Sequence, residues 1–446
     1  MLDLPCGVSR CCDGVSRRSF VRAGVLGMAG FGLADLLRLR ASAAGGGPIR
    51  AKAVILVWMH GGPSQLETYD PKPDAPSEVR GPFGSIPSNV PGLRLGDKLP
   101  LHAKMMDKVA ILRGYHHGNS DHWAAAHWVL TGHVGPNGAN RAAKNPSIGS
   151  VVSKLKGPNW SDVPALVNFN DGGFGYHGAT YLGVAHNPLQ TGDDSYGNEA
   201  PPLPATGPSS FRLPEGVDAG RFGDRRKLLQ SFDNFRRDVD QEGTLDGLDA
   251  FERRAMEMVL SGRTRKAFDL ADEDAATREL YGPGWGEQAL LARRLVEAGV
   301  TFVTLNTGYW DDHKLITPKL ENKLPRHDRM ISALINDLDR RGMLADTLVV
   351  AAGEFGRTPR INKFAGRDHW PDAGSILLAG GGIRGGTVIG ATDRKGERPT
   401  EAPVSPNDLG AIIYQALGIN PETVINDAND RPHALLPGGR VPAGLT

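Results

Sequence analysis

The segment Val349-Val-Ala-Ala-Gly-Glu-Phe-Gly-Arg-Thr-Pro359 indicates the fold more clearly than any other part of the chain. It begins as an apolar, β-rich run and ends abruptly at Gly353-Glu354, so a carboxylate stands at the tip of a predicted buried strand. Upstream, Phe302-Val-Thr-Leu-Asn306 has the same design and leads into Trp310-Asp-Asp-His313. Open α/β sheets bind ligands outside the carboxyl ends of their strands. The two motifs therefore predict an α/β protein with polar side chains gathered at one edge of its sheet.

Strands alternate with helices along the rest of the chain, which is typical of a mostly parallel central sheet with helices on both faces. Predicted strands span 53–59, 109–112, 165–169, 301–306, 347–352, 375–379 and 387–389, the last two as edge strands, and predicted helices span 121–130, 288–298, 320–341 and 406–417. A long Pro-, Gly- and Ser-rich loop at 186–215 precedes a charged, amphipathic segment, which predicts a helical insertion at about 215–285. We expect residues 44–446 to form a single domain.

The N-terminus predicts export from the cell. Ser16-Arg-Arg-Ser-Phe-Val-Arg22 has the form of a twin-arginine signal, and Ala41-Ser-Ala43 matches an A-x-A cleavage site. The apolar segment between them is interrupted by Asp35 and is shorter than the roughly 20 residues that span a bilayer, so we expect no stable membrane anchor. Residues 1–43 are therefore predicted to be a signal peptide for the twin-arginine export machinery, and the mature protein is predicted to be periplasmic or secreted.

Composition narrows the possible functions. All three cysteines, Cys6, Cys11 and Cys12, precede the cleavage site, so the mature chain has no disulfide and no cysteine nucleophile. Residues 1–43 hold six Arg and three acidic residues, so their removal takes the formal net charge from +1 to −2. Such a charge gives no reason to expect nucleic acid or an anionic membrane as a partner. The sequence also lacks the Gly-x-Ser-x-Gly elbow of α/β-hydrolases and a Gly-x-Gly-x-x-Gly motif that opens a helix.

The side chains that follow the two strands have the chemistry of a divalent-metal site, because His, Asp and Glu are common ligands of such ions. The segment Arg367-Asp-His-Trp370 adds a further carboxylate and imidazole eight residues after the first motif. At the predicted helix 121–130, His122 is a possible ligand. His127, five residues later, does not share its helical face, and we interpret it as structural.

Four motifs carry a resemblance to a known family. They are Gly61-Gly-Pro-Ser-Gln65, Trp310-Asp-Asp-His313, Gly353-Glu-Phe-Gly-Arg-Thr-Pro359 and Gly366-Arg-Asp-His-Trp-Pro371. They resemble the motifs of a large family of exported proteins of unknown function, within the alkaline phosphatase/sulfatase-like superfamily. The resemblance covers nearly the whole mature chain. It implies a metal centre, often with two ions, at the carboxyl edge of the sheet, where phosphate or sulfate esters bind.

The resemblance also implies roles for individual residues. By position, Asp311 and His313 match the aspartate and histidine that follow a middle strand, and Glu354 stands where relatives have an Asp-His pair. His369, together with Asp368, matches a late histidine ligand. Relatives have an acidic ligand directly after the first strand. This chain has His60 there, and Glu67 or Asp70 is the alternative ligand.

Two further assignments leave alternatives open. Superfamily spacing places the nucleophile near Ser120, where free backbone N–H groups at a helix start favour an anionic ester; alternatively, Ser120 or Asp121 is only the N-cap. Arg357 either clamps an ester oxygen or ties down backbone and carboxylate groups. A formylglycine nucleophile is disfavoured, because no [Cys/Ser]-x-Pro-x-Arg motif occurs.

The sequence thus predicts an exported metal-dependent hydrolase that acts on a phosphate or sulfate ester of a small molecule or polysaccharide. The predicted metal is a divalent ion, zinc favoured, as one or two ions. The candidate ligands are Asp311, His313, Glu354, Asp368, His369, His122 and His60, and the candidate catalytic residues are Ser120 and Arg357. The alternative is a non-catalytic exported protein that contains a metal and binds an envelope partner or a glycan.

Overall fold

A computed structural model describes residues 50–138, 142–169, 175–191, 262–427 and 429–446. The signal peptide predicted at 1–43 and most of the insertion predicted at about 215–285 lie outside these residues. None of the helices in the described ranges is long and apolar enough to cross a membrane.

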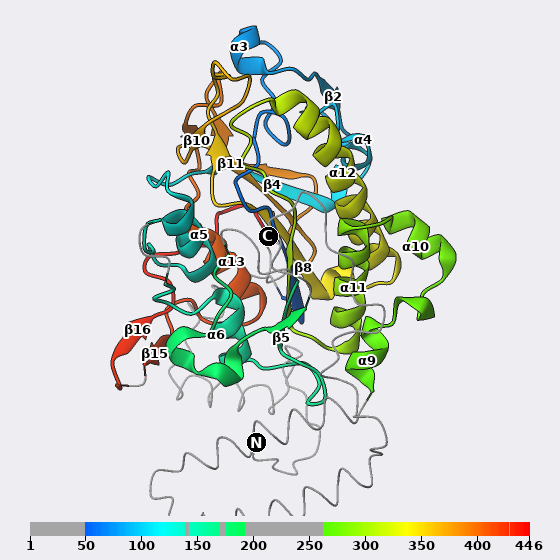
Figure 1. Ribbon diagram of the computed structural model, residues 1–446, viewed down its shortest axis with the longest axis vertical. Helices are drawn as coiled ribbons and strands as arrows, with labels where there is room; N and C mark the ends of the chain where they lie inside the picture. Colours follow the sequence, from blue (N-terminus) through cyan, green and yellow to red (C-terminus); the bar gives the residue numbers. More distant parts are fainter. Residues whose placement is uncertain (1–49, 139–141, 170–174, 192–261, 428) are drawn as a thin grey trace, which may run out of the picture. The chain divides into compact units, whose positions relative to one another are not determined.

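An eight-stranded sheet runs through the described part of the chain (Figure 1). Its strands lie in the order β12-β4-β11-β8-β1-β7-β5-β6. Their bounds are β1 Ala53–Trp58, β4 Val109–Tyr115, β5 Leu166–Phe169, β6 Leu189–Thr191, β7 Phe302–Asn306, β8 Thr347–Ala352, β11 Gly374–Ala379 and β12 Thr387–Ile389. Neighbouring strands pair in parallel except at β11, which is antiparallel to both β4 and β8. The predicted mostly parallel sheet is confirmed.

The position of β11 corrects one prediction. We expected this strand at an edge, but it lies inside the sheet between β4 and β8. Its side chains explain the position: Ile376 and Leu378 belong to one hydrophobic core, and Leu377 and Ala379 belong to the other. A strand that is apolar on both faces is stabilised where both faces are covered.

Helices cover both faces of the sheet (Figure 1). One face carries α11 (Trp285–Ala298) and α12 (Ile316–Arg340), with the shorter α4 (Pro100–Ala103), α9 (Arg263–Phe268) and α10 (Ala275–Tyr281), and the other carries α5 (His122–Thr131), α6 (Ile148–Leu155) and α13 (Pro406–Ala416). Side chains of β1 alternate between the two cores: Ile55 and Val57 pack with the first group, and Leu56 and Trp58 with the second.

Smaller elements complete the described fold. They are α3 (Ser77–Arg80), β2 (Ser85–Pro87), β3 (Arg94–Gly96), β9 (Gly356–Arg357), β10 (His369–Trp370), β13 (Ala391–Thr392), β14 (Pro399–Glu401), β15 (Val424–Asn426) and β16 (Pro432–Ala434). The hairpin β9–β10 matters most for the site, because it pairs His369 with Arg357 just after β8.

The register of three central strands brings their loops together. Trp58 at the end of β1 pairs with Asn306 at the end of β7 and with Ala352 at the end of β8. The three strands are parallel and end at the same level, so the loops that follow them start side by side. These loops carry His60, the Asp311 region and Glu354.

Candidate metal centre

Three histidines from different segments gather around the carboxylate of Asp311. His122 opens α5, His313 follows Asp311 in the loop after β7, and His369 lies in β10. Asp311 Oδ1 lies 3.3 Å from His122 Nε2, 2.9 Å from His313 Nε2 and 3.2 Å from His369 Nε2. Ligand atoms of His122, Asp311 and His369 all lie within 4.8 Å of one another, and His313 Nε2 is 2.9 Å from His369 Nε2. We call these four residues the His–Asp cluster.

Each histidine of the cluster is held from behind through its Nδ1 atom. His122 Nδ1 lies 2.5 Å from Glu354 Oε1, and His313 Nδ1 lies 2.8 Å from Asp368 Oδ1. His369 Nδ1 lies 2.8 Å from the backbone oxygen of Ser120. An imidazole that donates from Nδ1 to an oxygen presents an unprotonated Nε2, which is the form that binds a metal. All three Nε2 atoms face the same carboxylate oxygen, and each could bind a metal once its Nε2 proton is released, because Nδ1 can donate to the oxygen behind it.

Glu354 and Asp368, both candidate ligands, contact the histidines of the cluster. Glu354 is fully buried, and its two oxygens accept hydrogen bonds from Gly61 N at 2.8 and 3.1 Å as well as from His122. Asp368 accepts from His313 and from Asn362 Nδ2. Both carboxylates lie behind a histidine, not among the atoms that face Asp311 Oδ1. The direction of these side chains does not follow from their positions in the sequence.

Gly61 is required by the close approach of two strand-end loops. Its φ is +100°, a conformation that side chains other than glycine rarely adopt. A Cβ atom at this position would lie 2.7 Å from Asp311 N and 2.8 Å from Trp310 N. The absence of a side chain lets the Gly61 N–H reach Glu354 while the Asp311 loop packs directly above it.

Arg357 fixes Asp311 from the protein interior. Its guanidinium is fully buried and donates to Asp311 Oδ1 at 2.6 Å, to Gly62 O at 2.9 Å and to Gly61 O. Burial opposes ionisation of Asp311, but hydrogen bonds from His122 and His369 and the charge of Arg357 hold its pKa well below the usual range. Of the two roles left open for Arg357, the structure favours the second, because the guanidinium points to protein oxygens.

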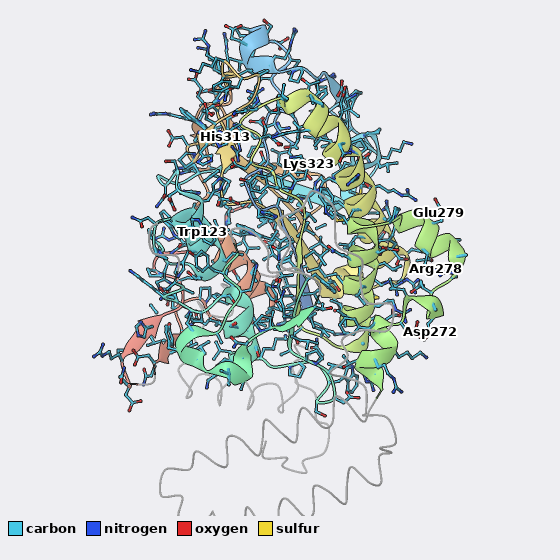
Figure 2. All side chains as sticks on the ribbon, viewed as in Figure 1. Trp123, Asp272, Arg278, Glu279, His313 and Lys323 are labelled. Atoms are coloured by element: carbon cyan, nitrogen blue, oxygen red, sulfur yellow. The ribbon has the colours of Figure 1, made fainter. Side chains whose placement is uncertain are left out.

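Tyr309 and Asp312, on either side of the Trp310–Asp311 pair, also have defined roles. Tyr309 donates its hydroxyl to Asp311 Oδ2 at 2.8 Å. Nothing in the sequence singled this residue out except its place beside the Trp310–His313 motif. Asp312 turns the other way and binds Lys323 Nζ at 2.6 Å (Figure 2 labels Lys323 on α12 and His313 near β10). Asp312 is thus an anchor between the loop and α12.

The residues after β1 do not join the cluster. His60 is buried, and burial lowers its pKa to about 4; its ring lies 5.8 Å from that of Tyr309, and it is outside the group of three with mutually close ligand atoms. The alternatives Glu67 and Asp70 are held elsewhere. Glu67 binds Arg367 at 2.5 Å, and Asp70 lies 3.0 Å from Lys72 Nζ.

Ser120 stands beside the cluster through its backbone. Its carbonyl oxygen is the acceptor for His369, and its side chain is exposed. The N-cap of α5 is Asp121, whose side chain accepts from Ala124 N at 3.0 Å. The capping role therefore belongs to Asp121. His127 is structural as interpreted from the sequence, since its Nδ1 binds His133 O at 2.8 Å.

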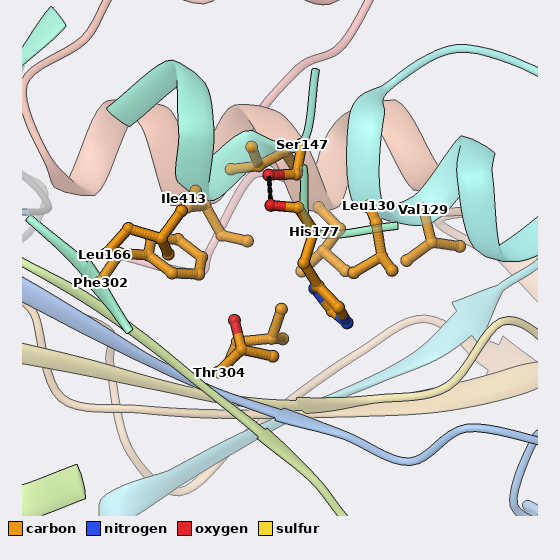
Figure 3. A pocket seen from close by; sticks show the side chains of 12 residues that line it. Val129, Leu130, Ser147, Leu166, His177, Phe302, Thr304 and Ile413 are labelled. Atoms are coloured by element: carbon orange, nitrogen blue, oxygen red, sulfur yellow. Dashed lines mark hydrogen bonds between the residues drawn. The ribbon is translucent and has the colours of Figure 1, made fainter. Parts of the chain in front are cut away.

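The cluster opens to solvent on one side. Side-chain exposure rises from 9% at His122 and 11% at Asp311 to 24% at His369 and 38% at His313. A more enclosed cavity lies elsewhere, between the sheet and the helices α6 and α13 (Figure 3). It is lined mostly by apolar side chains such as Leu166, Phe302 and Ile413, and measures only about 20 Å³. The open His–Asp cluster is the candidate site, because it alone of the two combines accessible space with ligand groups.

The chemistry of the cluster fits a metal ion. Three imidazole nitrogens and one ionised carboxylate match the donors of protein zinc sites. Each histidine also has the hydrogen-bonded partner on its other nitrogen that metal-binding histidines almost always have. Phe355 packs against the rings of both His122 and His369, with ring centroids 4.8 Å apart in each case, and covers the cluster on one side.

Comparison with known proteins identifies the family. A family model described as a protein of unknown function (DUF1501) matches residues 51–444. The match confirms the family-level expectation, while the predicted signal peptide lies outside the matched residues. No curated protein matches the chain.

Several solved structures are similar to the chain at low scores. The sulfatase PsFucS1 from Pseudoalteromonas sp. has a TM-score of 0.38 and 11% identity, over 83% of this chain and 68% of the other. Alkaline phosphatase from the Antarctic bacterium TAB5 has a TM-score of 0.38 and 11% identity, over 84% and 100%. The phosphonate monoester hydrolase SpPMH from Silicibacter pomeroyi has a TM-score of 0.36 and 11% identity, over 88% and 76%. Similarities of this size assign no activity.

Proposed function

We propose, for a chain that belongs to the DUF1501 family of proteins of unknown function, that it is a metal-dependent hydrolase of phosphate or sulfate esters. The observation that carries the proposal is the convergence of three Nε2 atoms on Asp311 Oδ1, at 2.9 to 3.3 Å. A cluster that served only stability would have no need to direct all its metal-binding atoms to one partly exposed point.

One zinc ion is the occupant that the donors support best. His122, His369 and Asp311 would hold it, with His313 as a further ligand from the exposed side. Among the described residues, one group of His, Cys, Asp and Glu side chains meets the spacing for a metal, which favours one ion over two. A divalent ion there would act as a Lewis acid on an ester oxygen and would stabilise the negative charge that develops during hydrolysis.

The residues around the cluster would hold the ligand side chains in place and keep Asp311 ionised. Arg357 and Tyr309 hold the two oxygens of Asp311 and keep this carboxylate ionised. Glu354 and Asp368 fix the rings of His122 and His313. Ser120 is our candidate nucleophile, because its backbone oxygen contacts His369 and the residue is exposed.

We further propose that the protein acts outside the cytoplasm. The twin-arginine pattern at 16–22 supports export, and this route carries folded proteins, which suits a chain that takes up its metal before transport. The substrate would then be an ester of a small molecule or of a polysaccharide, and nucleic acid is not an expected partner.

The test is a hydrolysis assay on the mature protein with aryl phosphate and aryl sulfate monoesters and diesters. Each ester is offered to protein as purified, after treatment with a chelator, and after zinc has been added back. Turnover of one ester class that is lost with the metal and restored by zinc would support the proposal and identify the ester. Stoichiometric zinc without turnover of any ester would reject the hydrolase and support a non-catalytic, metal-containing binding protein.

A further inference from the structure

A basic groove lies on the surface between the loop after Asp70, the end of α3 and the hairpin β2–β3. It has a volume of about 430 Å³, within the usual size range of ligand sites. None of its 11 lining residues is acidic, whereas three are basic: Lys72, Arg80 and Arg94. The other lining residues include Pro71, Pro73 and Pro82. The groove is therefore a positively charged recess with stiff, partly apolar walls.

The charges in this groove are only partly neutralised. The exposed Arg80 side chain forms no hydrogen bond or ion pair with any residue in the described ranges. Arg94 is held in place by Ser85, whose Oγ and backbone oxygen accept at 3.0 and 2.5 Å, and neither acceptor carries a charge. Lys72 shares the carboxylate of Asp70 with Arg113, so two cations face one anion there. An anionic ligand would supply the missing negative charge.

Both walls of the groove contact the segment 367–370, which contains His369. The buried Arg367, two residues before His369, donates to Glu67 and, at 2.9 Å, to Val79 O beside Arg80. On the other side, Trp370 Nε1 donates to Glu397 O at 2.7 Å. Gly396, which precedes Glu397, adjoins the groove, since a Cβ atom there would lie 3.7 Å from Lys72 Cε. The groove and the His–Asp cluster are thus connected through the same segment, residues 367–370.

We propose that this groove binds sulfate or phosphate groups of an extended anionic glycan while another ester of the same chain lies at the His–Asp cluster. This inference rests on the proposed function, whose substrate class it names. Guanidinium groups bind tetrahedral anions through paired hydrogen bonds, which Arg80 can supply from its whole guanidinium and Arg94 from the N–H groups that Ser85 does not engage. Single-stranded nucleic acid is less suited, because it requires aromatic platforms for its bases and the Phe83 ring is covered by Lys98, with Nζ 5.3 Å from its centroid.

The experiment measures binding of maltotetraose in three forms: sulfated, phosphorylated and unmodified. An oligonucleotide of equal charge is the fourth ligand. The proteins are the zinc-loaded mature chain, the double variant Arg80→Gln/Arg94→Gln, and the matched control Arg431→Gln/Arg440→Gln, which removes the same charge from exposed positions outside the groove lining. Calorimetric titrations of each protein are repeated with Asp311→Asn as background, so that binding is tested without the metal cluster.

We expect the sulfated or the phosphorylated sugar to bind and the unmodified sugar not to bind. The groove variant should lose about tenfold or more in affinity, as expected when charged hydrogen bonds are removed, and the control should stay within about twofold. The favoured sugar identifies which anion the groove recognises. Equal losses in both double variants, no binding by the wild type, or tighter binding of the oligonucleotide would each overturn the inference.

A kinetic comparison separates this inference from the proposed function. The groove variant should hydrolyse a small aryl ester at the wild-type rate, while kcat/KM for the anionic glycan ester falls about tenfold through KM. If no ester is hydrolysed but the binding difference persists in the Asp311→Asn background, the hydrolase proposal fails and glycan binding in the groove stands. If hydrolysis occurs and the groove variant behaves as the control, the groove inference alone fails.

Discussion

Within the described part of the chain, two clusters of histidine and aspartate can be compared, and one of them has the form of a metal centre. The second comprises Tyr69, His102, His327 and Asp328, and we call it the Tyr69 network. All four of its side chains are buried. The Tyr69 hydroxyl lies between His327 Nε2 at 2.7 Å and His102 Nε2 at 3.3 Å, and Asp328 Oδ1 lies 2.6 Å from His102 Nδ1.

The difference between the clusters lies in orientation and access. In the Tyr69 network, the Nε2 atoms end on a tyrosine hydroxyl, so no shared point is left for an ion. In the His–Asp cluster, three Nε2 atoms meet at one carboxylate oxygen and the rings become more exposed toward His313. Residue types alone do not make a metal site: the direction of the nitrogens and an open side decide it. The comparison predicts that mutations in the His–Asp cluster change metal binding and that mutations in the Tyr69 network change stability.

The largest effect is expected from Asp311→Asn. This change keeps the shape of the side chain but removes the charge on which the three histidines converge. We expect metal content to fall from about one ion per chain to near zero, and ester hydrolysis to fall by about a thousandfold, because a Lewis acid contributes several kcal/mol to catalysis. Elemental analysis and initial rates measure both. The matched control is Asp328→Asn in the Tyr69 network, which should keep its metal; loss of metal in both variants would remove the distinction between the clusters.

The next effect is expected in the stability of Asp328→Asn. The oxygens of Asp328 accept from His102 Nδ1 at 2.6 Å and from the backbone N–H groups of Leu101 and His102 at 2.9 and 2.8 Å. An amide nitrogen cannot accept, so at least one of these donors loses its partner, and the charge that strengthens the remaining hydrogen bonds is removed. We expect the free energy of unfolding in denaturant to fall by about 3 kcal/mol at pH 7. A fall of under about 1 kcal/mol, the size of an average single mutation, would show that the network does little to stabilise the fold.

Sequence patterns predicted where the site lies better than what each residue does there. Parallel strands bring their carboxyl ends to one edge, so the location of Asp311, His313 and Glu354 follows from the two apolar runs. The direction of the Glu354 side chain does not follow, because it depends on Gly61 and His122, which lie 293 and 232 residues away along the chain. The same limit explains β11: its apolar residues predict a strand but not its place between β4 and β8.

The Tyr69 network shows why some polar groups escape sequence analysis. Tyr69 lies 33 residues from His102 and 258 from His327, so no local motif unites them. The residues after β1 show the converse. His60, Glu67 and Asp70 follow a strand end and have ligand chemistry, yet only the fold shows that Arg367 and Lys72 already engage the two carboxylates.

A smaller effect is expected for Glu354→Gln, which tests the support behind the ligands. The amide oxygen can still accept from Gly61 N and His122 Nδ1, but the loss of the charge lowers the basicity of the His122 ring, so its Nε2 becomes a weaker metal ligand. We expect zinc affinity to weaken by about 10- to 100-fold, as is typical when a carboxylate that supports a metal ligand is lost. Competition with a chelator measures it. The control Asp337→Asn changes an equally buried carboxylate, bound to Arg341 at 2.9 Å, and should leave zinc affinity unchanged; equal weakening in both would indicate a general loss of packing.

The smallest effect concerns the pH dependence of stability, and it comes from the Tyr69 network. Burial, together with the charge of His102, lowers the pKa of His327 well below its ordinary value of 6.5. The unfolded chain binds a proton at this residue below pH 6.5 and the folded chain does not, so acid favours unfolding. His327 should reduce the free energy of unfolding by up to about 1.4 kcal/mol per pH unit below that point.

Replacement by glutamine tests this slope independently of any constant loss of stability. His327→Gln keeps a polar group near the Tyr69 hydroxyl but cannot titrate, so unfolding free energies measured from pH 7.5 to 4.5 should fall less steeply than in the wild type. His177 is an internal comparison, because burial lowers its pKa to about 4 and His177→Gln should flatten the curve between pH 6.5 and about 4. An unchanged slope in His327→Gln would mean that His327 is charged in the folded protein. The Tyr69 network would then hold a buried cation, and the contrast with the His–Asp cluster would rest on solvent access alone.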